Sequence, residues 1–138
     1  MSSFEQYKSA YEQASYYIPE PGFDLRIEEF HKDFFEFLKE NNIKQWAMVS
    51  AYNPGSKKCA QIENEAAHNR LRVLLSQEGY EFRKAVHRDP NGKWPIEKSF
   101  FIANIELKNA IALAKKFKQN AIVAGNINAV PHLFDCTQ

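Results

Sequence analysis

Three polar clusters in this sequence have the residue types needed to bind or transform a small molecule. The first follows an apolar run and is predicted to be a loop at the end of a central strand; its candidate ligand-binding residues are Ser50, Tyr52, Asn53 and Ser56. Hydroxyl, amide and backbone N–H groups at such a position could hold a small anionic or amide-bearing ligand. The alternative is an ordinary turn in which Pro54 and Gly55 set the geometry and Ser56 caps a helix.

The second cluster lies on a predicted helix and contains the candidate ligand-binding residues Asn64, Asn69 and Arg70. Asn64 and His68 are four positions apart, so their side chains share one face of that helix. One interpretation is a helix end that faces a ligand, and the other is a solvated surface with weak ion pairs. His68 has no second His or Cys at metal-ligand spacing, so the sequence predicts no metal site.

The third cluster leads into a predicted strand and contains Trp94, Glu97 and Ser99. Burial beside Trp94 would raise the pKa of Glu97, whereas Lys98 would lower it, and the sequence leaves the sign open. A carboxylate beside an aromatic ring suits proton transfer or the binding of a cationic group. Glu97 is therefore the candidate catalytic residue, and a surface glutamate paired with Lys98 is the alternative.

Composition narrows the classes of function. Eighteen Lys and Arg against seventeen Asp and Glu give a net charge of +1, so the long-range positive field of a nucleic-acid-binding protein is absent. No apolar run is long enough for a membrane span, and the first residues do not resemble a secretion signal, so we expect a cytoplasmic protein without a membrane partner. The sequence has no phosphate-binding loop, nucleotide fingerprint or nucleophile elbow, and we predict no cofactor.

Hydrophobic periodicity predicts the elements that must position these clusters. In the N-terminal part we expect a helix over 3–16, a turn at 19–22, a short strand over 24–27 and a helix over 28–41. The remaining expected elements are a strand over 46–51, a helix over 62–75, strands over 80–87 and 99–105 separated by a turn at 89–92, a helix over 107–117, a strand over 120–125 and a short edge strand over 132–135.

The order from residue 44 onward is strand, helix, strand, strand, helix, strand. This βαββαβ order is typical of ferredoxin-like α+β domains, in which helices cover one face of an antiparallel sheet. We therefore expect a ferredoxin-like domain over 44–138 and an N-terminal helical extension over 1–43 that packs on it. The other face of the sheet would be open, or covered by the N-terminal helices or by a second subunit.

Several segments resemble known families. AYNPGS, then ENEAAHNRLRVLL, a Trp-Pro and Glu-x-Ser element, and AxxLAKKFKQNAIVAG together resemble the bacterial domain-of-unknown-function family three-two-nine-three over about residues 10–135. That family brings no established activity.

A more distant likeness is to the phage S-adenosylmethionine lyases, which have a PII-like fold. WAMVSAYNP at 46–54 looks like their first strand and loop, and an aromatic-x-Glu element follows where Trp94 and Glu97 stand. This likeness implies a homotrimer with an adenine-containing ligand between subunits, Glu97 on the cationic end of the substrate, and polar groups from the 50–56 loop. It also implies a reaction in which the carboxylate of the substrate itself displaces methylthioadenosine.

Two hypotheses of function follow. The first is a small-molecule enzyme acting on S-adenosylmethionine or a related adenine nucleotide, with Glu97, Tyr52 and Asn53 at its site. The second is a non-catalytic PII-like module that binds a metabolite or a partner protein, because a shared fold does not imply a shared activity. A purely structural accessory protein is a third alternative.

Overall fold

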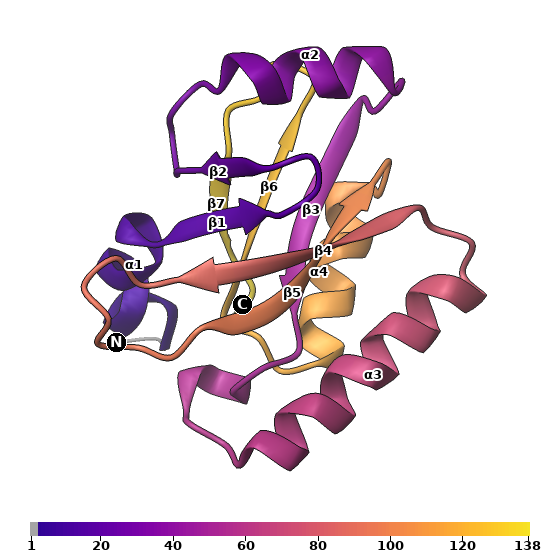
Figure 1. The fold of residues 1–138 in the computed structure, drawn as a ribbon. Helices are drawn as coiled ribbons and strands as arrows, with labels where there is room; N and C mark the ends of the chain where they lie inside the picture. The colour runs from indigo at the N-terminus through magenta and orange to yellow at the C-terminus, as the bar shows by residue number, and fades with distance from the viewer. Residues whose placement is uncertain (1–2) are drawn as a thin grey trace.

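The chain forms one curled antiparallel sheet with helices on both of its faces (Figure 1). The computed structural model describes residues 3–138. Its elements in chain order are α1 (Ser3–Gln13), β1 (Ser15–Ile18), β2 (Phe23–Leu25), α2 (Lys32–Glu40), β3 (Gln45–Ser50), the short 3-10 helix η1 (Pro54–Ser56), α3 (Gln61–Gln77), β4 (Phe82–Arg88), β5 (Glu97–Ala103), α4 (Leu107–Lys116), β6 (Ala121–Asn126) and β7 (His132–Asp135).

Seven strands lie side by side in the order β2-β1-β4-β5-β3-β6-β7, and each neighbouring pair is antiparallel. The sheet curls until side chains from both of its edges meet in one apolar cluster, where Leu25 of β2 joins Val123 of β6 and Leu133 of β7 packs against the cluster. The curl therefore gives the sheet a concave face that is largely enclosed by the sheet itself.

Helix α2 covers part of the concave face. Phe34 and Leu38, four residues apart on one side of α2, are fully buried against Trp46 and Phe101. The helix begins after His31, whose ring Nδ1 accepts a hydrogen bond from the Phe34 N–H at 3.1 Å and so satisfies a free helix-end donor. Of the alternatives for the second sheet face, cover by an N-terminal helix is the one observed.

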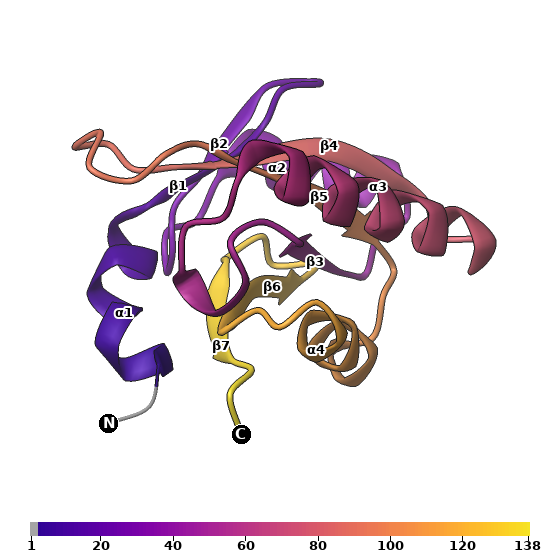
Figure 2. The same cartoon turned by 90° about the horizontal axis from the view of Figure 1, so that it is seen from below.

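Helices α3 and α4 cover the convex face. Leu71 and Leu75 of α3 and the small residues Ala110 and Ala114 of α4 are buried in a second apolar cluster on that face. Helix α1 lies on the opposite side of the molecule from α3 and α4 in both views (Figures 1 and 2). None of the helices over residues 3–138 combines the length and apolar composition that crossing a membrane requires.

The N-terminal part corrects two sequence predictions. The helix expected over 3–16 ends at Gln13, and Ser15–Ile18 forms strand β1. The apolar period of the helix continues to Ala14, but Tyr16 is paired with Leu25 on one side and with His87 on the other. Tertiary strand pairing thus overrides the local helical pattern. Residues 15–25 add a hairpin to the sheet, which has seven strands. The short strand expected over 24–27 corresponds to β2, and β1 is the strand that was not expected.

Gly125 gives a test of the packing on the concave side. A Cβ atom at this position would lie 2.8 Å from Cζ2 of Trp46 and 2.9 Å from the carbonyl oxygen of Val130. Trp46 is fully buried, so its ring has little room to move. We expect Gly125→Ala to lower the free energy of unfolding by about 1–3 kcal/mol in urea denaturation. Gly125→Ala should lower the free energy of unfolding by less when Trp46 is replaced by Phe. A Gly125→Ala protein as stable as the wild type would contradict this packing.

Candidate ligand-binding site

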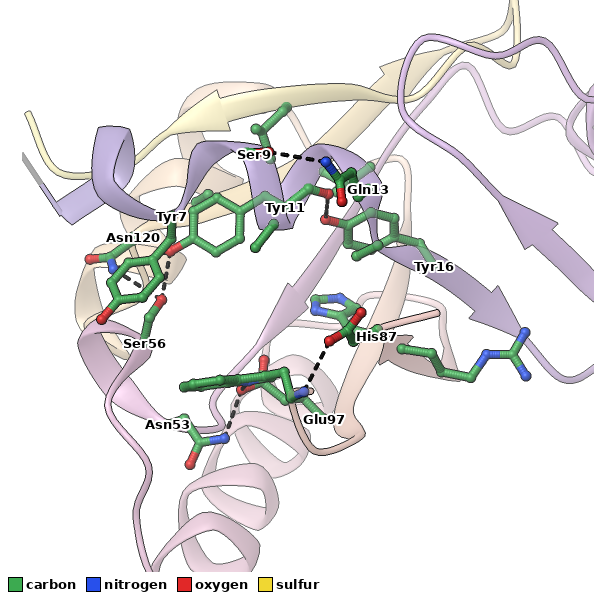
Figure 3. A pocket seen from close by; sticks show the side chains of 18 of the residues that line it. Tyr7, Ser9, Tyr11, Gln13, Tyr16, Asn53, Ser56, His87, Glu97 and Asn120 are labelled. Carbon is green, nitrogen blue, oxygen red and sulfur yellow. Dashed lines mark hydrogen bonds between the residues drawn. The ribbon is translucent and has the colours of Figure 1, made fainter. Parts of the chain in front are cut away.

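A cavity of about 470 Å³ lies between α1 and the concave face of the sheet (Figure 3). This volume is within the range of small-molecule sites. The aromatic side chains on its walls are Tyr7, Tyr11, Tyr16, His87 and Trp94, and the uncharged polar ones include Asn53, Ser56 and Asn120. Two carboxylates, those of Asp89 and Glu97, are among the lining residues.

Strand register places three of these residues in one row. Tyr16 of β1 is paired with His87 of β4, and His87 is paired with Glu97 of β5. Residues directly opposite each other on antiparallel strands project to the same face of a sheet. The hairpin β1–β2 therefore brings a phenol ring to the imidazole and carboxylate supplied by the central strands.

Glu97 is held through one of its two oxygens. Its Oε2 accepts hydrogen bonds from Nδ2 of Asn53 at 2.7 Å and from the indole N–H of Trp94 at 2.8 Å. Burial raises the pKa of Glu97, and these two hydrogen bonds oppose the rise without cancelling it. Its Oε1 accepts no hydrogen bond from residues 3–138 and is not among their buried unpartnered atoms, so this oxygen is free to face the cavity.

No cation among the described residues pairs with Glu97. Lys98, its neighbour in sequence, points to the other face of the sheet and forms an ion pair of 2.7 Å with Glu65 of α3. Arg88 and Lys93 also line the cavity, but neither forms an ion pair with Glu97. The alternative of a surface Glu97–Lys98 pair is therefore not what the structure contains. An ionised Glu97 would place a negative charge in the cavity without a paired protein counter-ion.

The loop before β5 fixes the position of Trp94. The carboxylate of Asp89 accepts hydrogen bonds from the backbone N–H groups of Asn91, Lys93 and Trp94 at 2.9–3.0 Å. These hydrogen bonds, of which the one from Asn91 has the largest effect, hold the pKa of Asp89 below its usual range. The Asp-Pro-Asn-Gly turn predicted at 89–92 is thus confirmed, and its first residue anchors the indole that bonds Glu97.

Asn53 is fixed from the opposite side by α3. Its backbone is left-handed, with φ of 46°, a conformation that asparagine tolerates better than most residues. The Asn53 N–H donates to Oδ1 of Asn64 at 2.8 Å, and Nδ2 of Asn64 donates to Oδ1 of Asn53 at 2.9 Å. Both asparagines are 4% exposed. A buried chain of amides therefore connects α3 to the carboxylate of Glu97.

A second polar cluster lies on the α1 side of the cavity. The hydroxyls of Tyr11 and Ser56 are 2.5 Å apart, and Nδ2 of Asn120 donates to both, at 3.2 and 3.1 Å. The Tyr16 hydroxyl donates to the backbone oxygen of Tyr11 at 2.6 Å. Burial is the main cause that raises the pKa of both tyrosines, so both are neutral phenols at neutral pH.

His87 is a half-buried residue on the cavity wall, with its ring Nε2 shielded from solvent. Its ring edge meets the ring of Tyr16 with centroids 4.8 Å apart, and its Nε2 has no hydrogen-bond partner among residues 3–138. Burial lowers the pKa of His87 to about 4, so the ring is neutral at neutral pH. A buried polar atom without a partner costs stability, and a functional role is one explanation for such an atom in a folded protein.

The acid sensitivity of the fold tests the state of His87. Between pH 6.5 and pH 4 the unfolded chain binds a proton at this residue whereas the native chain does not, so stability falls as the pH falls. We expect His87 to remove about 2 kcal/mol from the free energy of unfolding between pH 7 and pH 5. Urea denaturation of the wild type and His87→Phe should show this extra loss in the wild type. Equal pH dependence in the two proteins would contradict a buried neutral ring.

The structure brings four of the predicted site residues together around the cavity: Asn53, Ser56, Trp94 and Glu97. Asn64 lies directly behind Asn53. Ser50 and Ser99 are paired on β3 and β5 and are buried; the Ser50 hydroxyl donates to the Lys98 carbonyl at 2.7 Å, and the Ser99 hydroxyl has no partner among the described residues.

Three other predicted residues lie away from the cavity. The Tyr52 hydroxyl donates to Glu65 on the α3 side, and burial together with this carboxylate raises the pKa of Tyr52 to about 12. Asn69 and Arg70 are exposed on α3, where Asn69 accepts hydrogen bonds from Arg72. Their position agrees with the solvated-surface interpretation of that part of the helix.

Sequence reasoning missed Tyr11, Tyr16, His87 and Asn120 as residues of the cavity. Tyr11 belongs to the apolar period of α1, which indicated packing and not a site. His87 falls in a predicted strand, but its neighbours in the sheet depend on strand β1, which was not predicted. Asn120 precedes β6 and carries no local signal of its own.

Comparison with known proteins gives one finding. A family model described as "Protein of unknown function (DUF3293)" matches residues 49–122, a segment that includes Asn53, Asn64, His87 and Glu97. No curated protein and no solved structure matches the chain significantly.

Proposed function

We propose that this chain, which belongs to the DUF3293 family of proteins of unknown function, is a small-molecule enzyme whose cavity binds an organic cation. The observation that carries the proposal is the half-buried carboxylate of Glu97, which lines an aromatic-walled cavity and has no paired counter-ion among the described residues. S-adenosylmethionine, whose sulfonium is such a cation, is the first ligand to test.

The walls of the cavity favour an onium cation over a protonated amine. The faces of aromatic rings attract cations, and a methylated sulfonium or ammonium is weakly hydrated and donates no strong hydrogen bond. The cavity supplies the rings of Trp94, Tyr11 and Tyr16 together with the carboxylate of Glu97. A ligand cation at Glu97 would also relieve the cost of keeping an isolated charge away from water.

The proposed chemistry needs no protein nucleophile. The carboxylate oxygen of S-adenosylmethionine attacks the side-chain carbon bonded to sulfur, a C–O bond forms as the C–S bond breaks, and the electron pair passes to sulfur. The products are a lactone and methylthioadenosine. Because the negative carboxylate and the positive sulfonium neutralise each other in this step, a site poor in water favours the reaction, and the chain has to contribute orientation and electrostatics.

The proposal extends to the fold. A ferredoxin-like unit formed by β3, α3, β4, β5, α4 and β6 is supported by the strand order β4-β5-β3-β6, by antiparallel pairing throughout, and by two helices on one face. The cavity is lined by residues of one chain, so the proposed ligand site does not require the homotrimer that the phage lyase likeness implies.

Thermal-shift and product measurements test the function. Ligand at 100 times its dissociation constant should stabilise the fold by about 2.7 kcal/mol, a shift of several degrees for a domain of this size. We expect S-adenosylmethionine to raise the melting temperature and methylthioadenosine to accumulate in a chromatographic assay. A shift without product would favour the alternative, a non-catalytic binding module, and no shift with any sulfonium or quaternary ammonium compound would contradict a cation site.

A further inference from the structure

The cluster of Tyr11, Ser56 and Asn120 faces the cavity from the wall opposite Glu97 (Figure 3). The three residues come from α1, from the end of η1 and from the position just before β6. Their side chains join through contacts of 2.5, 3.1 and 3.2 Å. No charged side chain takes part in these contacts, so this wall presents neutral hydrogen-bonding groups whereas the other presents a carboxylate.

Counting hydrogens shows what the cluster can offer a ligand. The amide of Asn120 donates to both hydroxyls. Tyr11 and Ser56 have one hydroxyl hydrogen each, and only one of these hydrogens can lie between the two oxygens. The other hydrogen has no acceptor among residues 3–138. One O–H group of the cluster is therefore free to donate a hydrogen bond to a ligand in the cavity.

The position of Tyr11 depends on this cluster. Helix α1 has no buried residue, and its side-chain hydrogen bonds to the rest of the fold include those of the Tyr11 hydroxyl to Ser56 and Asn120. In addition, the Tyr16 hydroxyl donates to the Tyr11 carbonyl at the end of the helix. A ligand that accepts the spare hydrogen would complete the network that holds α1 over the cavity.

We propose that Tyr11, Ser56 and Asn120 form a second subsite, which donates a hydrogen bond to the neutral, acceptor-bearing part of the ligand while Glu97 binds its cation. Acceptors of this kind are ring nitrogens and the hydroxyl or ether oxygens of a nucleoside. The subsite deepens the proposed function and rests on it for the class of ligand. The cavity thus selects a ligand that combines a cationic end with an uncharged nucleoside-like end.

Calorimetric titration with three probes separates the two subsites. S-adenosylmethionine carries both ends, methylthioadenosine carries the neutral end, and trimethylsulfonium carries the cation alone. We expect the double variant Tyr11→Phe/Ser56→Ala to weaken S-adenosylmethionine and methylthioadenosine about 3- to 10-fold and to leave trimethylsulfonium unchanged. Both hydroxyls have to be removed, because either one alone would keep a hydrogen that it can donate to the ligand. Tyr17→Phe, which removes a hydroxyl from strand β1 outside the cavity, is the matched control and should change none of the three affinities.

The outcomes distinguish failure of the subsite from failure of the proposed function. Unchanged affinities of S-adenosylmethionine and methylthioadenosine in the double variant, with circular dichroism equal to that of the wild type, would overturn the subsite alone. Binding of methylthioadenosine that is weakened in the double variant, without binding of either sulfonium, would overturn the cation site and support the subsite. If none of the three probes binds the wild type, both are overturned.

Discussion

Replacing Glu97 with Gln is expected to lower the affinity for a sulfonium cation about 10- to 100-fold and to stop turnover. The substitution keeps the shape of the side chain and one oxygen that can accept from Asn53 and Trp94, but it removes the charge. Hydrogen bonds and contacts that involve a buried charge contribute about 1.5–3 kcal/mol, which corresponds to this loss. Titration calorimetry with S-adenosylmethionine measures it directly.

Glu63→Gln is the matched control, because it removes a carboxylate that is exposed on α3 and should leave the affinity unchanged. The pH dependence provides a second readout. A cation binds the carboxylate form, so wild-type affinity should rise with pH through the pKa of Glu97, which burial raises above its ordinary value. The affinity of Glu97→Gln should not change over that range. A pH profile shared by both proteins, or equal affinities, would contradict a cation held by Glu97.

Replacing Asn64 with Ala is expected to lower the free energy of unfolding by about 2–4 kcal/mol. Asn64 is buried and exchanges two hydrogen bonds with Asn53, so its removal leaves the Asn53 N–H without an acceptor inside the protein. The same change removes one of the two hydrogen bonds to Oδ1 of Asn53, the other being from the Cys59 N–H, and so loosens the amide that donates to Glu97. Affinity for the cation should therefore fall as well. Urea denaturation and calorimetry on the same sample measure the two effects.

Asn69→Ala is the control for Asn64→Ala. Asn69 lies on the same helix, is exposed, and accepts hydrogen bonds from Arg72. Its loss should change the free energy of unfolding by no more than about 0.5 kcal/mol. Equal changes in the free energy of unfolding for the two substitutions would show that the hydrogen bonds between Asn64 and Asn53 have no special role in stability. A destabilised Asn64→Ala that keeps its affinity for the cation would show that these hydrogen bonds do not position the site.

The fold is predictable from the sequence where the hydrophobic period and the turn signals agree. The apolar run that includes Trp46 and Val49 is indeed a buried strand, and the helices around Leu71 and Ala110 occur where they are expected. The end of α1 is not predictable in this way, because the apolar spacing of the helix continues to Ala14. The transition to a strand depends on pairing with β4, which lies far away in sequence.

The candidate site is predictable to the same limited degree. Trp94, Glu97 and Asn53 are predicted as site residues because their indole, carboxylate and amide groups lie next to strand ends in the sequence. In the structure, Asn53 and Trp94 both donate to the same oxygen of Glu97, Oε2. Tyr16 and His87 could not be assigned to the site, because their place beside Glu97 follows from strand register. Tyr52 shows the opposite case: its neighbour in sequence, Asn53, faces the cavity, while its own side chain bonds Glu65 on the other side.

The most direct test of a charge-selective cavity is a comparison of two nearly identical ligands. S-adenosylmethionine and S-adenosylhomocysteine differ by one methyl group and by the positive charge on sulfur. Because Glu97 has no ion-pair partner among the described residues, the wild type should bind S-adenosylmethionine at least about 10-fold more tightly in calorimetric titration. Equal affinities, or tighter binding of the neutral thioether, would contradict the proposed cation site.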